Sequence, residues 1–266
     1  MIRFAIFVDG SNLFGSLKDL GVQVDDYQRF FGHVFKVAEE EWRNAVGAGK
    51  NTDTVLQRVY WYQVGTIDTW NLDDAQSQAY LRERFDENKP VRDGYMARAG
   101  KLLPGKSQAE VGLKAWSLCF DEFRAWYENK KRILEGMQRF HHGVQTSTDI
   151  IDILEIGHWK VDLLGHSCDE KGLDTRLAVD MVALEGNYDV AVVVSGDADS
   201  IPSIDLMKRR NKHVGAVEFV RGYPPEQKGR GFSSKIKLSS DFVARIYEME
   251  LVSKKFARKA PAGGIA

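Results

Sequence analysis

Two apolar segments of this sequence end in aspartates that stand next to a glycine. Residues 2–8 run into Asp9, and residues 190–194 run through Ser195 and Gly196 into Asp197, with Asp199 two positions further on. In an open parallel sheet, ligands bind beyond the carboxyl ends of the strands, so carboxylates far apart in the chain can meet there. We therefore expect Asp9, Asp197 and Asp199 to face one cleft.

A fourth carboxylate, Asp174, stands where a helix is predicted to begin, and the positive end of that helix favours its negative charge. Four carboxylates in one cleft repel one another unless a cation neutralises them. A site with oxygen ligands only, without His or Cys, selects Mg²⁺ or Mn²⁺ over zinc. Each acid also has a structural explanation, as a turn residue, a helix cap or a loop acid. Their joint occurrence at strand ends is what favours a metal site.

Polar neighbours of these acids suit the same chemistry. The amide of Asn12 can hold a water or a carboxylate, and the hydroxyl of Ser11 or Ser195 can donate to a phosphate or to a neighbouring aspartate. Metals held by carboxylates supply the activated water and the charge stabilisation that phosphodiester hydrolysis requires. Asn12 could instead serve only the turn that follows the first strand.

The elements that must position these residues alternate between strands and helices. Apolar or β-branched runs predict strands at 2–8, 55–64, 150–156, 159–164, 190–194 and 213–220. Apolar residues three and four positions apart predict helices at 25–45, 177–184, 201–210 and 241–251. This alternation is typical of an α/β fold with a mostly parallel central sheet.

The middle of the chain has a different pattern. Long charged helices are predicted at 73–88 and 111–142, with a loop at 89–106 between them. We expect a single domain over 1–258 that carries this helical insertion at about 66–147, and a disordered tail at 259–266. The insertion is assigned to substrate or partner control, although it could merely extend the core or form a dimer face.

Charge is unevenly distributed over the second half of the chain. Residues 149–199 hold twelve acids against three bases, and residues 207–237 hold nine bases against two acids. An acidic centre beside a basic margin suits a metal-dependent site that acts on a polyanion, although two solvated faces of opposite sign would look the same. The expected phosphate contacts are Lys208, Arg209, Arg210, Lys212, Lys228 and Arg230.

Composition narrows the class of protein. With 266 residues, 43% of them hydrophobic, the chain can bury a core without disulfides. Its two cysteines, Cys119 and Cys168, are too few for a disulfide framework and are expected to be buried apolar residues in a reducing compartment. No apolar run approaches the length that spans a bilayer. We therefore expect a soluble cytoplasmic protein.

Three blocks of sequence together resemble the NYN domain, in the LabA-like branch of the PIN-like ribonuclease superfamily. They are Phe7-Val8-Asp9-Gly10-Ser11-Asn12-Leu13, then Lys171-Gly172-Leu173-Asp174 with Ala178-Val179-Asp180-Met181, then Val192-Val193-Val194-Ser195-Gly196-Asp197-Ala198-Asp199. They occur in the order of that family. The resemblance covers residues 1–65 and 148–220.

The resemblance implies a PIN-like α/β/α sandwich and a metal-dependent nuclease, most simply an endoribonuclease that uses Mg²⁺ or Mn²⁺. It implies an acidic cluster of Asp9, Asp174, Asp197 and Asp199 with Asn12 beside it. Asp180 also matches the pattern, and six residues after Asp174 it would lie about 120° further round a helix, so we place it in a supporting position with Ser11 and Ser195. RNA is the implied partner.

Other functions fit the sequence less well. A haloacid dehalogenase-type phosphatase requires Asp-x-Asp after the first strand, where this chain has Asp9-Gly10-Ser11, and no Gly-x-Gly-x-x-Gly turn marks a dinucleotide site. A non-catalytic RNA-binding or regulatory module on the same fold remains the alternative. A binding module would gain nothing from repelling acids that face a polyanion. RNA against DNA, the cleavage preference and a homo-oligomeric state are left open.

Overall fold

The computed structural model describes residues 1–225, 228–229 and 234–260. These residues form two compact units. The sheet unit comprises residues 1–64, 140–157 and 172–266, and the helical unit comprises residues 65–139 and 158–171. The chain passes between the units within β3, α5 and β4 and again after β5.

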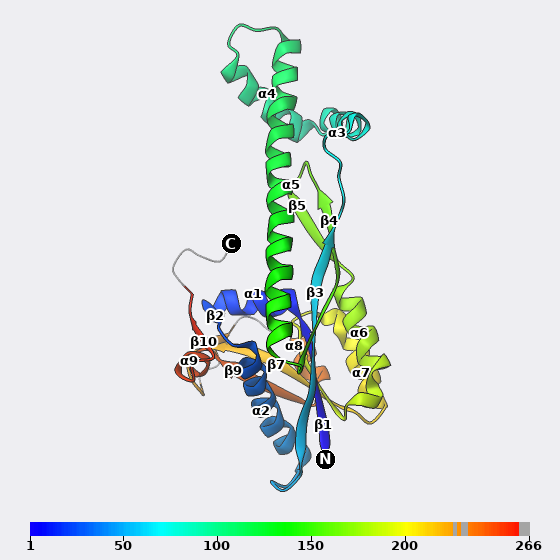
Figure 1. Ribbon diagram of the computed structural model, residues 1–266, viewed down its shortest axis with the longest axis vertical. Helices are drawn as coiled ribbons and strands as arrows, with labels where there is room; N and C mark the ends of the chain where they lie inside the picture. Colours follow the sequence, from blue (N-terminus) through cyan, green and yellow to red (C-terminus); the bar gives the residue numbers. More distant parts are fainter. Residues whose placement is uncertain (226–227, 230–233, 261–266) are drawn as a thin grey trace. The chain divides into compact units, whose positions relative to one another are not determined.

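The elements follow one another as Figure 1 labels them. The strands are β1 (Ile2–Asp9), β2 (Val22–Val24), β3 (Thr54–Ile67), β4 (Ile151–Asp162), β5 (Ser167–Lys171), β6 (Val190–Val194), β7 (His213–Arg221), β8 (Lys228–Gly229), β9 (Phe242–Tyr247) and β10 (Ala257–Lys259). The α-helices are α1 (Gly10–Leu20), α2 (Tyr27–Val46), α3 (Ala75–Glu87), α4 (Lys89–Leu102), α5 (Gln108–Ser147), α6 (Leu173–Ala183), α7 (Ile201–Arg209), α8 (Ser234–Ser239) and α9 (Glu248–Ser253). Two 3₁₀ turns, η1 (Glu185–Asn187) and η2 (Ala198–Ser200), flank β6.

The sheet is mostly parallel and is built around β1. Its strand order is β5-β4-β3-β1-β6-β7-β8, and β9 also pairs with β7. The pairs β1/β3, β1/β6, β6/β7 and β7/β9 are parallel, whereas β4/β5 and β7/β8 are antiparallel. Residues Phe4 to Val8 are buried on both faces, as a central parallel strand requires. The α/β fold with a mostly parallel sheet is therefore confirmed.

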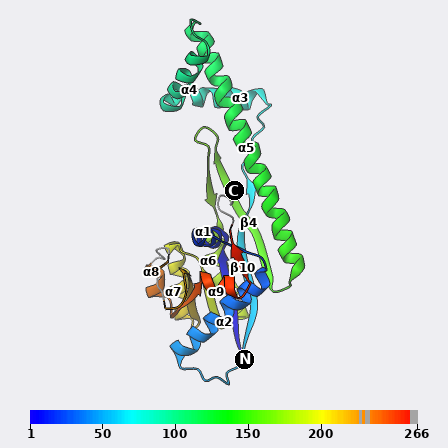
Figure 2. The same ribbon diagram turned by 90° about the vertical axis from the view of Figure 1, so that its left-hand side faces the viewer.

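Helices cover both faces of the sheet in the sheet unit, as two views show (Figures 1 and 2). Alternate β1 residues Phe4, Ile6 and Val8 join one core cluster with residues of α1 and α2. Phe7, between them, contacts Tyr60 and Tyr188 instead. Helix α6 contacts β1 and α7 contacts β7, so helices on both sides complete an α/β/α arrangement.

The helical unit has a core of its own. Its buried side chains are Leu72, Leu81, Phe85, Ala99, Ala115, Cys119, Phe123, Tyr127, Val161 and Leu163. On α5, Phe123 and Tyr127 are buried in this core, and Trp116, Phe120 and Trp126 pack against it. The unit also holds the β4/β5 hairpin, whose strand β5 had no sequence signal. Within the described part of the chain, no helix combines the length and the apolarity needed to cross a bilayer.

Several predicted boundaries need correction. Residues 89–106 are not a loop, because α4 occupies Lys89–Leu102. Asn88 caps it by accepting from the Val91 N–H, and the proline near its start is tolerated in a first turn, where no donor is lost. Residues 150–156 and 159–164 form one strand, β4, since Gly157 continues the extended backbone.

The C-terminal part differs most from prediction. Residues 241–251 are not one helix: β9 occupies Phe242–Tyr247 and α9 follows. Buried Phe242, Ala244 and Ile246 alternate with less buried neighbours at the period of a strand, which the helical interpretation overlooked. The expected disordered tail begins too early, because Lys259 lies in β10 opposite Val22; residues 261–266 lie outside the described residues.

Close packing of β9 on β7 yields a prediction. A methyl group at Gly215 would lie 2.2 Å from the ring of Phe242, which is buried. We expect Gly215→Ala to lower the free energy of unfolding by about 1 to 3 kcal/mol through overpacking. Gly32→Ala on α2, where a methyl meets nothing within 4 Å, should instead raise stability slightly through helix propensity. Urea denaturation of both variants measures the difference, and equal stabilities would contradict the packing of β9.

Candidate active site

Asp9 ends β1 and caps α1, so it joins the sheet to the first helix. Its carboxylate accepts from the Asn12 N–H at 3.0 Å and from the Asn12 side-chain amide. Residues 9–12 were predicted as a turn, whereas Gly10 already begins α1. Asp9 is only 3% exposed, and a buried carboxylate requires such donors. Local capping thus fixes the direction of this carboxylate.

Asn12 and Ser195 connect the end of β1 to the end of β6. The Gly196 N–H donates to Oδ1 of Asn12 at 3.1 Å, and the Ser195 hydroxyl lies 3.4 Å from Oδ2 of Asp9. Ser195 Oγ also accepts from the Asp197 N–H. The structure therefore brings Asn12 and Ser195 to Asp9, as the sequence predicted, while Ser11 lies exposed in the first turn of α1.

The segment after β6 presents the next two acids. Asp197 caps the 3₁₀ turn η2, accepting from the Asp199 N–H at 3.0 Å, and its carbonyl accepts from the Ser200 hydroxyl. Asp197 is half-buried and Asp199 is exposed. Their carboxylates therefore stand at the carboxyl end of β6, where α7 begins.

The carboxyl of Asp174 is influenced by the three other acids. Partial burial, repulsion from Asp9, Asp197 and Asp199 and a hydrogen bond to Asp9 together raise its pKa to about 6. These influences come from the end of β1, more than 150 residues before Asp174 in the chain, and from the segment at η2, which follows α6. Asp174 therefore lies within electrostatic range of the other three acids.

The donor set suits a hard cation. All four acids offer oxygen only, and a divalent ion would relieve the repulsion that acts on Asp174. As the described side chains are placed, no three His, Cys, Asp or Glu residues among them form a ready metal-binding group. The other three carboxylates therefore influence Asp174 electrostatically, but the acids are not arranged as the ligands of a metal ion.

Asp180 takes a supporting position and does not join the cluster. It is 7% exposed and accepts from the Tyr62 hydroxyl at 3.2 Å and from Nε of Arg176 at 2.8 Å. Burial is the main reason why the pKa of Tyr62 is raised, and the neighbouring Asp180 carboxylate contributes to the same shift. This chain of contacts holds the Arg176 guanidinium on α6, two residues from Asp174.

Two residues at this edge belong to none of the sequence motifs. Arg176 lies two residues after Asp174, and this spacing could have indicated a role beside the acids. Gln63 follows Tyr62, the register partner of Asp9, and is 2% exposed. Its carboxamide packs on Gly10, where a methyl group would lie 2.5 Å away, and its Nε2 has no hydrogen-bond partner among the described atoms.

The predicted phosphate contacts are mostly engaged within the protein. Lys208 bonds Asp241 and the Ser239 carbonyl, Arg210 bonds Glu185, and Lys212 bonds the Tyr188 carbonyl. Arg209 is exposed and makes no ion pair among the described residues. Lys228 lies in β8, and Arg230 lies outside the described residues.

Repulsion at Asp174 predicts a gain in stability when its charge is removed. With the divalent ions chelated by EDTA, Asp174→Asn should raise the free energy of unfolding at pH 7.5. The gain should be at most about 1 kcal/mol, because the side chain is only partly buried and solvent screens its charge. A matched control is Asp53→Asn, an exposed acid at the opposite end of β3, which should change little.

The gain must also depend on pH. Because the pKa of Asp174 is raised in the folded protein, its ionisation opposes folding above about pH 6, and this cost disappears as the pH falls through that value. The difference between Asp174→Asn and the wild type should therefore shrink at pH 5. A stability gap that is the same at both pH values would contradict the convergence of the acids.

The comparison with protein families agrees with this geometry. Residues 124–229 match the family model of the NYN domain, a range that includes Asp174, Asp197 and Asp199 and begins within α5. Neither the comparison with curated proteins nor that with solved structures found a match. Residues 124–229 are therefore similar to the NYN domain, a domain of the PIN-like nuclease superfamily.

Proposed function

We propose that the protein is a metal-dependent endoribonuclease that hydrolyses phosphodiester bonds at Asp9, Asp174, Asp197 and Asp199, with Mg²⁺ or Mn²⁺ as cofactor. The observation that carries the proposal is the raised pKa of Asp174, to which the three other carboxylates contribute. Such repulsion is costly to a protein, and the charge of a bound cation would offset it. The NYN domain supports a nuclease in particular.

Each residue then has a task in the hydrolysis. The four carboxylates would hold the cation, which would supply the positive charge that stabilises the attack of water on the phosphodiester. Asn12 keeps the Asp9 carboxylate in place and joins it to the Gly196 backbone. Ser195 links Asp9 to the backbone of Asp197. Water adds to phosphorus, its proton leaves to a carboxylate or to solvent, and one P–O ester bond breaks.

Two cations are suited to hold the phosphates of the substrate. Among the described residues, the Arg176 guanidinium donates one hydrogen bond, from Nε to Asp180, so its terminal N–H groups remain available to an anion. Arg209 at the end of α7 is exposed on the same unit. An arginine fork matches a phosphate better than a lysine does, because it can donate two parallel hydrogen bonds.

Cleavage assays test the proposal directly. We expect the purified protein to cut an end-labelled single-stranded RNA in Mn²⁺ or Mg²⁺ and to be inactive in EDTA. Asp197→Asn should lower the rate at least about a hundredfold, since one ligand of the cation is lost while the cap of η2 can still be made by the amide. Denaturing gels resolve the products, and a DNA of the same sequence shows whether RNA is preferred.

The control separates a nuclease from a binding module. Asp53→Asn removes an acid far along β3 from the cluster and should leave the cleavage rate unchanged. RNA binding without cleavage in either metal, by wild-type protein, would refute the catalytic proposal and support the non-catalytic RNA-binding module instead. Cleavage that persists in EDTA would refute the metal dependence.

Arg209 provides a test of the basic margin. Because it makes no ion pair among the described residues, Arg209→Gln should weaken RNA binding without disturbing the fold. The slope of log affinity against log salt should flatten by about 0.7, the value for one contact to a single strand. Lys50→Gln, a change in the loop before β3, is the matched control. Equal slopes for both variants would show that α7 does not contact RNA.

A further inference from the structure

The helical unit contains a groove that the acidic cluster does not use. It has a volume of about 650 Å³, within the range of ligand sites. We call it the Trp70 groove, and its lining residues come from α3, β4 and the segments that follow β3 and β4. The residues that matter for recognition are Trp70, Tyr80, Arg84, Glu87, Lys160 and Asp162.

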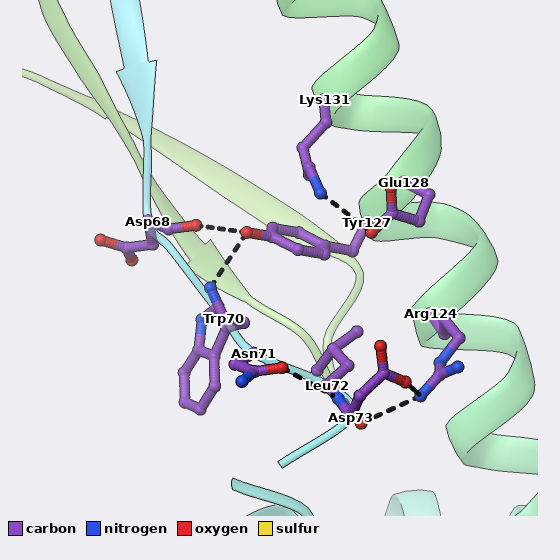
Figure 3. Close-up of polar contacts among 9 residues, drawn as sticks. All are labelled: Asp68, Trp70, Asn71, Leu72, Asp73, Arg124, Tyr127, Glu128 and Lys131. Carbon is purple, nitrogen blue, oxygen red and sulfur yellow. Dashed lines mark hydrogen bonds and ion pairs between the residues drawn. The ribbon is translucent and has the colours of Figure 1, made fainter.

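Trp70 is held in place through its backbone. The buried Tyr127 hydroxyl of α5 donates to the Asp68 carbonyl at 2.7 Å and accepts from the Trp70 N–H at 3.0 Å. Arg124, one turn earlier on α5, donates to the Leu72 carbonyl and to the Asp73 carboxylate. Figure 3 shows that the Trp70 indole points away from α5, while the backbone around it is tied to that helix.

Two aromatic rings form one wall of the groove. The rings of Trp70 and Tyr80 lie 6.1 Å apart between centroids, with 21° between their planes. Tyr80 is 49% exposed, which is high for so large an apolar side chain, whereas Leu81 beside it is buried. A fixed, nearly parallel pair of rings with an exposed face is a surface on which a flat base can stack.

The polar residues of the groove suit a nucleotide. Arg84 and Lys160 make no salt bridge among the described residues, so both charges remain available to a phosphate. Glu87 and Asp162 offer carboxylate oxygens to the exocyclic amino groups of a base. One oxygen of Asp162 already accepts from the Gly165 N–H, which fixes its position. A nucleotide with an unpaired base presents the face and the edge of that base together with a neighbouring phosphate.

We propose that the Trp70 groove binds an unpaired base and its adjacent phosphate in single-stranded RNA, with the base stacked on Tyr80. This inference rests on the proposed function, because it takes RNA as the substrate, and it gives the helical unit the task of selecting unpaired segments. Double-stranded RNA is excluded from the groove, since its bases are already stacked on one another.

Binding measurements with a labelled oligonucleotide test this assignment. The probe is a fluorescein-labelled 12-nucleotide single-stranded RNA, and its fluorescence polarisation is measured in EDTA, with a gel confirming that it stays intact. Tyr80→Ala should weaken binding at least about fivefold, and Tyr80→Phe, which keeps the ring, should restore most of the affinity. Leu113→Ala on α5, another exposed apolar side chain of the same unit, should bind like the wild type. Thermal melting confirms that Tyr80→Ala is folded.

The outcomes separate this inference from the nuclease proposal. Unchanged affinity in Tyr80→Ala, or no RNA binding by the wild type, overturns the groove assignment. An equal loss of affinity for a duplex of the same length also overturns it. Weaker binding in Tyr80→Ala together with no cleavage by the wild type in Mn²⁺ supports the groove and refutes the nuclease. Metal-dependent cleavage by the wild type, together with unchanged RNA affinity in Tyr80→Ala, supports the nuclease proposal and overturns the groove assignment.

Discussion

Parallel pairing of β1 with both β3 and β6 is the constraint on which the candidate site depends. This register sets Asp9 opposite Tyr62 and Val8 opposite Val194, so β1 and β6 end at the same level, while β3 continues to Ile67. The polar residues after those ends must then share one edge, whatever their distance in the sequence. Because β1 is buried on both faces, a slip by one residue would exchange its side chains between the two differently packed faces, and the core therefore holds the register that the site requires.

The same edge carries an electrostatic cost that its neighbours only partly offset. Asp9 is satisfied by the cap of α1, and Asp180 by Tyr62 and Arg176. Asp174 has no cationic partner among the influences on its pKa, and repulsion from three carboxylates acts on it. A fold selected for stability alone would place a neutral residue there, so the unrelieved charge at Asp174 is the strongest sign of function at this edge.

The sequence predicts those features of the structure that depend on residues close together in the chain, and it misses features that depend on distant contacts. The strand-end acids could be found because apolar runs that stop at Asp9 and Ser195 are local signals. Helix α4 could not be predicted, because its glycines and its proline are typical of a loop. The cap at Asn88 that begins the helix can be recognised only from the backbone structure. Strand β9 has the alternation of a strand, but only its pairing with β7 decides between strand and helix in so short a segment. Gln63 escaped notice because its role comes from contact with Gly10, across the sheet.

In the helical unit, side-chain hydrogen bonds hold an irregular segment of the chain in place. Its segment from Asp68 to Asp73 has no regular secondary structure, so its backbone groups need partners from elsewhere. Tyr127 and Arg124 of α5 supply them, and the carboxylate of Asp68 accepts from the Val161 N–H and from His158. Side chains of α5 thus fix an irregular segment of the chain, and as a result Trp70 stays beside Tyr80. A core alone does not require this, whereas a preformed surface for a flat ligand does, because ordering the aromatic rings beforehand lowers the entropy lost on binding.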